Sequence, residues 1–125
     1  FAIVAHLDAV IIPDSVTEIE NLAFYGCSYL TYVKLGENTK NIGEYAFANC
    51  TGIGSVSLEC NLSSIEESTF SGCTNISSVH WNIKTLDDFD YNYYDEEKRG
   101  LFASAENLTA FTFGDKVEYI PAYYP

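Results

Sequence analysis

The chain has 125 residues, a length that suits one domain, and its composition of 47% hydrophobic and 19% charged residues is typical of ordered globular proteins. The formal net charge is −12 and only six residues are Lys or Arg, so we expect neither nucleic-acid binding nor attachment to an anionic membrane surface. No apolar run approaches the length of about 18 residues that a membrane helix needs, and we expect no membrane insertion within this segment.

A short motif containing Phe and Cys returns along the chain at a constant spacing. AFYGC at residues 23–27 is followed by AFANC at 46–50 and TFSGC at 69–73, so equivalent residues lie 23 apart. Internal repeats of this length are typical of solenoids, and we count about four and a half copies. The register extends backwards through Phe1, Val4, Leu7, Val10 and Ile12, and forwards, after an insertion, through Phe102, Ala105, Leu108, Phe111, Phe113 and Ile120.

Each repeat predicts a short helix and then a short strand. The apolar residues of segment 19–27 recur at the spacing of one helix face, and those of segment 30–35 approach the alternation of a strand. The residues concerned are Ile19, Ala23, Phe24 and Cys27 for the helix, and Leu30, Val33 and Leu35 for the strand. Gly26, Gly52 and Gly72 predict the turns between them. One such unit cannot bury its own apolar face, so the repeats are expected to stack.

The segment IPDSVTEIENLAFYGCSYLTYVKL, residues 12–35, resembles the BspA-type leucine-rich repeat, which occurs in surface proteins of bacteria and some protozoa. The resemblance covers nearly the whole chain and implies an α/β fold: a right-handed leucine-rich-repeat solenoid with a parallel β-sheet on the concave face and short helices on the convex side. Residues 1–125 are expected to form a single solenoid. The chain begins without Met and ends without a stop signal, so we expect a fragment of a longer protein.

The aligned cysteines are predicted to be packing residues of the solenoid interior. Val4 and Ala105 occupy the same repeat position as Cys27, Cys50 and Cys73, and a catalytic or metal-binding thiol does not tolerate such exchange. We therefore expect no metal and no cofactor. The predicted core ladder consists of Phe24, Cys27, Phe47, Cys50, Phe70, Cys73 and Phe102. Cys60 aligns with Asp14 and Glu37 instead, which predicts an exposed loop thiol that either stays idle or forms a crosslink.

Catalysis is not expected. Only His6 and His80 offer an imidazole base, and no nucleophile motif such as G-x-S-x-G occurs. Ser57 lies one repeat before His80 in the same column, but stacking alone would bring these two residues together.

An insertion at residues 87–99 interrupts the fourth repeat. It contains acids together with Tyr91, Tyr93 and Tyr94. The segment imitates the start of a calcium-binding loop, but Tyr93 and Arg99 stand where that loop needs Gly and a carboxylate. A recognition loop and an ordinary solvated insertion both remain open interpretations.

The strand residues between the buried ones are predicted to form an open face. Of the eighteen acids in the chain only Asp8 falls in this set, which is otherwise rich in hydroxyl groups. The candidate binding residues are Tyr32, Lys34, Ser57 and His80 on this face, and Tyr91, Tyr93 and Tyr94 in the insertion. The resemblance implies a non-catalytic cell-surface or secreted module that binds proteins or glycans of a host or neighbouring cell. The alternative is a structural spacer within a larger surface protein.

Overall fold

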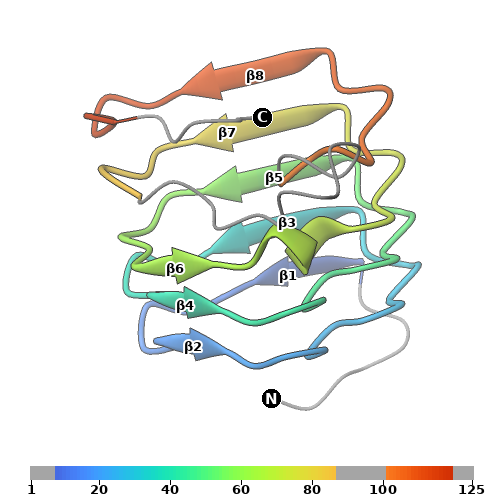
Figure 1. The fold of residues 1–125 in the computed structure, drawn as a ribbon, viewed down its shortest axis with the longest axis horizontal. Helices are drawn as coiled ribbons and strands as arrows, with labels where there is room; N and C mark the ends of the chain where they lie inside the picture. The colour runs from blue at the N-terminus through green and yellow to red at the C-terminus, as the bar shows by residue number, and fades with distance from the viewer. Residues whose placement is uncertain (1–7, 87–100, 120–125) are drawn as a thin grey trace, which may run out of the picture.

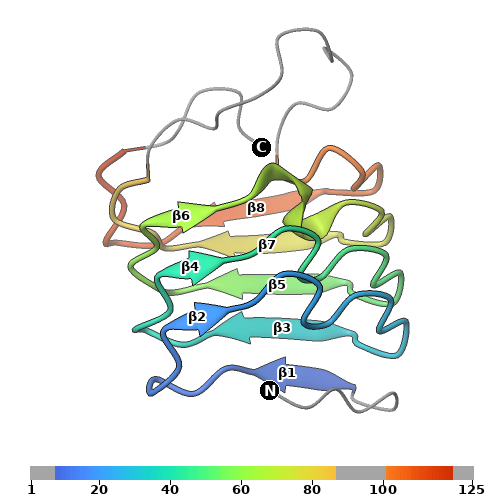
Figure 2. The same ribbon diagram turned by 60° about the horizontal axis from the view of Figure 1, so that its bottom comes forward.

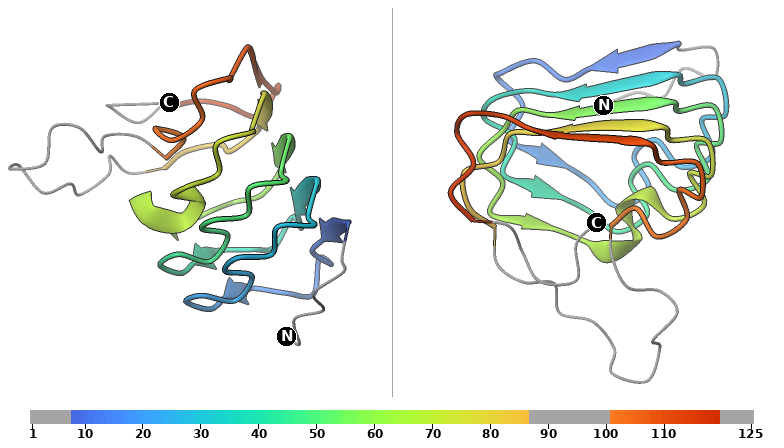
Figure 3. Two further views of the ribbon diagram at one scale, coloured as in Figure 1. Left: turned by 90° about the vertical axis from the view of Figure 1, so that its right-hand side faces the viewer. Right: turned by 90° about the horizontal axis from the view of Figure 1, so that it is seen from above.

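A computed structural model describes residues 8–86 and 101–119 of the chain. The chain winds in successive coils, and the strands of these coils form two parallel sheets (Figure 1). The five-stranded sheet contains β1 (Ala9–Ile11), β3 (Tyr32–Leu35), β5 (Ser55–Leu58), β7 (Ser78–Trp81) and β8 (Ala110–Phe113), in that order. The three-stranded sheet contains β2 (Glu18–Ile19), β4 (Asn41–Ile42) and β6 (Ser64–Ile65). The described residues therefore form a β-solenoid whose two sheets lie on different sides of the coil (Figures 2 and 3).

The strand register confirms the repeat alignment. Val10 pairs with Val33, Val33 with Val56, and Val56 with Val79, so residues 23 apart in the sequence are neighbours in the sheet. β7 and β8 continue this pattern across the insertion, since Val79 pairs with Phe111. The insertion therefore does not shift the register of the parallel strands.

The core lies between the two sheets and is built from columns of equivalent residues. Phe24, Phe47, Phe70 and Phe102 form a stack whose ring centroids are 5.1, 5.5 and 5.1 Å apart. All four rings are at most 3% exposed. Burial of a side chain of this size contributes on the order of 2–3 kcal/mol, which makes the stack a main source of stability.

The sequence predicted a short helix in each repeat, and this prediction is wrong for most of the described residues. Ile19 lies in β2, and the only helix in the described part of the chain is a single 3₁₀ turn, η1 (Glu67–Phe70). Backbone N–H groups that a helix would use internally bond to the next coil instead: Phe24 donates to the carbonyl of Ala46 at 2.7 Å, and Gly26 to that of Ala48 at 2.9 Å. Stacking thus satisfies these groups between coils.

The turn after each Phe needs a left-handed backbone. Gly26 and Gly72 have φ of +72° and +77°, and Asn49 fills the equivalent position with φ of 56°. Gly and Asn adopt this conformation most readily, which explains their recurrence there.

The last strand departs from the buried pattern. Phe113 occupies the repeat position of the buried residues Leu35, Leu58 and Trp81, but it is 49% exposed. β8 ends the sheet order, and no further coil covers it in the part of the chain that the structure describes. Phe1, Val4, Leu7 and Ile120 lie outside the described residues. Within residues 8–86 and 101–119, no helix has the length and apolar character to cross a membrane.

Candidate binding face

The outer face of the five-stranded sheet presents two columns of side chains. Parallel pairing in register aligns equivalent residues of neighbouring strands, as the sequence predicted. One column is Ala9, Tyr32, Ser55, Ser78 and Ala110; the other is Ile11, Lys34, Ser57, His80 and Thr112. We call this surface the open face.

Polar side chains on the open face bond to one another along the columns. The hydroxyl of Ser78 donates to that of Ser55 at 3.1 Å. The Nδ1 atom of His80 lies 3.0 Å from the hydroxyl oxygen of Thr112, and its Nε2 atom lies 3.2 Å from a carboxylate oxygen of Glu59. These two contacts hold the imidazole in a defined orientation above the sheet.

The predicted binding residues on the sheet differ in accessibility. Tyr32, Lys34 and His80 are partly exposed, as expected. Ser57 lies on the predicted face but is only 9% exposed, less than these three side chains. Its short side chain lies in the column between the longer Lys34 and His80, which leave little room for solvent. Ser57 therefore forms the floor of the face.

The chain of Glu59, His80 and Thr112 has the connectivity of a carboxylate, an imidazole and a hydroxyl. Nucleophilic catalysis also needs a site where a substrate is enclosed and its developing charge is stabilised. Here the side chains of His80 and Glu59 are 37% and 40% exposed on the surface of a sheet, where water screens their interaction. Among the described residues, no group of three or more His, Cys, Asp or Glu side chains is placed to hold a metal.

A groove of about 390 Å³ borders the open face beyond the carboxyl ends of its strands. Its lining includes the cations Lys34 and Lys116 and the carboxylates Asp14, Glu37 and Glu59. The groove adds charged groups of both signs to a face whose centre carries mainly hydroxyls.

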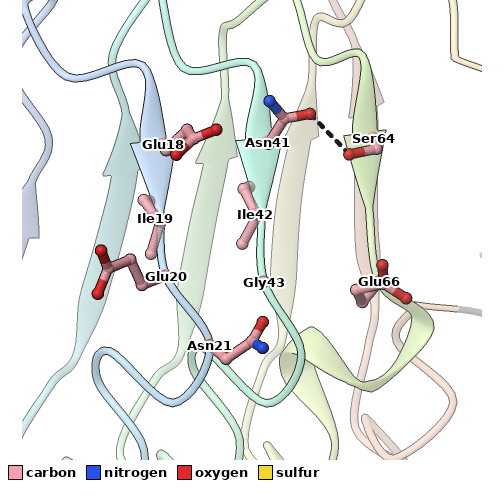
Figure 4. A pocket seen from close by; sticks show the side chains of 9 residues that line it. All are labelled: Glu18, Ile19, Glu20, Asn21, Asn41, Ile42, Gly43, Ser64 and Glu66. Atoms are coloured by element: carbon pink, nitrogen blue, oxygen red, sulfur yellow. Dashed lines mark hydrogen bonds between the residues drawn. The ribbon is translucent and has the colours of Figure 1, made fainter.

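A second groove, of about 480 Å³, lies over the three-stranded sheet (Figure 4). Its lining carries Glu18, Glu20 and Glu66 together with amides and a hydroxyl, and the Ser64 hydroxyl donates to the Asn41 amide oxygen at 2.8 Å. Among the described residues that line this groove, none is Lys or Arg. We call this surface the acidic groove.

The cysteine column is buried, as predicted, and so is Cys60. Cys27, Cys50 and Cys73 are at most 7% exposed, and burial raises the pKa of Cys50 to about 12 and that of Cys73 to about 11. The expectation of an exposed Cys60 is wrong: its side chain is 2% exposed, and burial raises its pKa to about 12. All four thiols are free.

Comparison with protein families identifies the type of repeat. The model of the BspA-type leucine-rich repeat region matches residues 1–124, with six copies, which differs from the four and a half counted from the sequence spacing. The chain belongs to this family. Comparison with curated proteins and with solved structures gives no match.

The features of this BspA-type repeat were not equally visible in its sequence. The open face followed from alternation, whereas the acidic groove was missed because segment 19–27 was expected to be helical. The repeat itself contained a usable signal, since Glu20 and Glu66 stand at equivalent positions two copies apart. His6 and the insertion at 87–99, with Tyr91, Tyr93 and Tyr94, lie outside the described residues.

Proposed function

We propose that this chain is a non-catalytic binding module of a cell-surface or secreted protein, and that it mediates adhesion to proteins or glycans of a host or neighbouring cell. Membership of the BspA-type repeat family supports a binding or structural repeat module. Beyond family membership, the proposal specifies the location of the protein at the cell surface or outside the cell, the type of partner and the surface that the partner contacts.

The side-chain arrangement of the open face is the observation that carries the proposal. Its centre consists of the short side chains of Ser55, Ser57 and Ser78, which let a partner approach the strands closely. Tyr32, Lys34 and His80 stand around this floor and are partly exposed. Aromatic and cationic side chains of this kind contribute strongly to binding when a partner excludes water from them.

Charge separates this face from the rest of the molecule. The chain carries a net charge of −12, yet the two columns contain no Asp or Glu and include Lys34. An acidic partner can therefore approach the open face with less repulsion than it meets elsewhere.

The test is a binding screen of the intact chain against matrix proteins and a glycan array, followed by variants measured against each ligand found. Tyr32→Ala combined with His80→Ala should weaken binding at least tenfold, which corresponds to about 1.4 kcal/mol. Tyr29→Ala combined with Lys40→Ala is the matched control, because it removes a Tyr and a cation from positions away from the open face. The control should bind like the unmodified chain.

Two outcomes would move or remove the proposed site. Unchanged affinity in the open-face variant, with loss of binding on deletion of Asp88–Lys98, would assign contact to the insertion and Tyr91, Tyr93 and Tyr94. The absence of any ligand would favour the alternative function, a structural spacer within a larger surface protein.

A further inference from the structure

Two bulky residues adopt a left-handed backbone in the turns that follow β2 and β4. Leu22 and Tyr45 have φ of 63° and 55° and occupy equivalent positions in successive coils. Both are exposed, at 53% and 45%. Gly, Asn or Asp would suit this conformation better, and bulky side chains adopt it only rarely.

Tyr25 lies in the same turn as Leu22, and its backbone N–H donates to the Leu22 carbonyl at 3.2 Å. Its side chain is 47% exposed, and its hydroxyl accepts a hydrogen bond of 2.8 Å from the Asn49 amide of the next coil. This bond fixes the ring while leaving much of it accessible to solvent. Leu22, Tyr25 and Tyr45 thus present apolar and aromatic surface in these turns, which we call the tyrosine edge.

The tyrosine edge continues into the acidic groove. Asn21, which lines the groove, directly precedes Leu22, and Gly43, which also lines it, stands two residues before Tyr45. The carboxylates of Glu18, Glu20 and Glu66 are exposed there, and no cation lies among the lining residues that the structure describes. The combined surface offers negative charge beside aromatic and aliphatic side chains.

This combination is complementary to Arg and Lys. Their cationic ends pair with carboxylates, while their long stems and the Arg plane pack against Tyr rings and Leu. The spacing of the carboxylates restricts the partner further. Glu20 and Glu66 stand two coils apart, so their backbones are separated by about 10 Å at the usual strand spacing. A peptide in the polyproline II conformation rises about 3.1 Å per residue with three residues per turn, so side chains three positions apart lie on the same side and about 9 Å from each other.

We propose that the acidic groove and the tyrosine edge together bind an extended basic segment of a partner protein, with Arg or Lys residues three positions apart. One cation pairs with Glu20 and the next with Glu66, and the side chains between them pack against Leu22 and Tyr45. This surface lies on the three-stranded sheet and its following turns, so it does not depend on the function proposed for the open face.

The test is a fluorescence anisotropy titration of the full chain with a labelled peptide, Gly-Arg-Ser-Gly-Arg-Ser-Gly, at low and at physiological salt. We expect saturable binding that weakens as salt increases. The same composition with adjacent Arg residues should bind several-fold less tightly, and a peptide with Glu in place of Arg should not bind. Absence of saturable binding, or equal affinity for the two Arg peptides, would overturn the proposal.

Two variants locate the site. Glu20→Gln combined with Glu66→Gln removes the charge, and Leu22→Asn combined with Tyr45→Asn removes the apolar contacts. Asn suits the left-handed backbone, so the second variant should fold at least as well as the unmodified chain. Each pair of changes should weaken binding about tenfold.

The controls are matched in chemistry and placed elsewhere. Ile11→Ser removes an exposed apolar side chain from the open face, and Glu37→Gln combined with Asp115→Asn removes two exposed acids away from the acidic groove. Both should bind like the unmodified chain. An equal loss in the acid control would show attraction by net charge alone and would overturn the assignment. Sedimentation of the chain without peptide should show a monomer, and self-association lost in Leu22→Asn/Tyr45→Asn would assign this edge to a second copy instead.

Discussion

The Cys50 thiol donates a hydrogen bond of 3.0 Å to the backbone carbonyl of Phe24 in the preceding coil. Cys73 makes the same bond of 3.0 Å to the carbonyl of Phe47. Each carbonyl also accepts a local N–H, from Cys27 and Cys50 respectively. The thiol therefore donates to the second lone pair of the carbonyl oxygen, and its sulfur packs as an apolar group in the core. The recurring Cys thus links successive coils in addition to filling space.

This burial predicts very slow reaction of all four thiols with a water-soluble thiol reagent. The side chains of Cys27, Cys50, Cys60 and Cys73 are 7%, 0%, 2% and 0% exposed. Thiolates are the reactive form, and burial opposes their formation. In native buffer we expect no rapid phase, and in denaturant all four thiols should react. A rapid phase in native buffer that disappears in Cys60→Ala would show that Cys60 is exposed, as the sequence predicted, and would contradict its burial.

The same burial predicts a loss of stability at alkaline pH. Burial raises the pKa of Cys50 and Cys60 from 9.0 to about 12, so unfolded chains release these protons first as the pH rises. Each thiol's contribution is fully present below pH 9.0 and is lost progressively as the pH rises towards about 12. One thiol lowers the free energy of unfolding by up to about 1.4 kcal/mol per pH unit in this window.

The measurement is urea unfolding of the unmodified chain and of Cys60→Ala across this pH range. Tyr and Lys titrate in the same range, and comparing the two chains cancels their contribution. The variant should lose stability less steeply with pH. Equal slopes would show that Cys60 ionises as readily in the folded chain as in the unfolded one.

The Phe stack predicts that Phe47 is a critical core residue. Its ring lies 5.1 Å from that of Phe24 and 5.5 Å from that of Phe70, so Phe47→Ala removes contacts with both neighbours. We expect the free energy of unfolding to fall by about 3–5 kcal/mol. Phe113→Ala is the matched control because this ring is 49% exposed, and it should cost less than about 1 kcal/mol. Similar costs for both variants would contradict the core assignment.

The repeat spacing explains why the columns could be predicted. Once Val33, Val56 and Val79 are aligned, parallel stacking leaves one choice of neighbour at every position, and the structure has these pairs. The same argument identified the Phe and Cys ladder and the open face. Periodicity between copies was thus more informative than periodicity within a copy.

Periodicity within a copy was misleading for segment 19–27. Apolar residues at helical spacing also suit a bent coil whose backbone bonds to its neighbours, and local sequence cannot show which partners the N–H groups find. The prediction that Cys60 is exposed was wrong for a related reason. Asp14 and Glu37 are exposed at the equivalent position, but Ile83, one copy later, is fully buried. The column changes from polar to apolar along the solenoid, and Ile83 was the signal for it.

Substitution of Gly26 tests the cost of backbone strain without a contribution from side-chain packing. Its φ is +72°, and a Cβ atom added there would meet nothing within 4 Å. Gly26→Ala should therefore cost about 1–2 kcal/mol through conformation alone. Gly26→Asn should be closer to neutral, because Asn49 adopts φ of 56° at the equivalent position. Thermal unfolding of both variants measures the difference, and a neutral Ala variant would show that this turn tolerates a different backbone.

The flanks of the insertion predict that the solenoid folds without it. Leu86 and Leu101, on either side, are 5% and 1% exposed, and β7 pairs with β8 in the same phase as the earlier strands. Deleting Asp88–Lys98 shortens a connection, and loop shortening of this size changes chain entropy by only about 1 kcal/mol.

The deleted chain should keep one cooperative urea transition, with a midpoint near that of the unmodified chain, and its four thiols should stay protected. The matched control replaces the same residues with a Gly/Ser segment of equal length, which keeps the connection but removes its aromatic side chains. If both chains lose cooperative unfolding, Tyr91, Tyr93 and Tyr94 belong to the core. If only the shortened chain does, the connection needs its length to join two coils that are otherwise complete. Retention of the fold in both would leave these tyrosines free for recognition, where binding assays can test them without interference from stability.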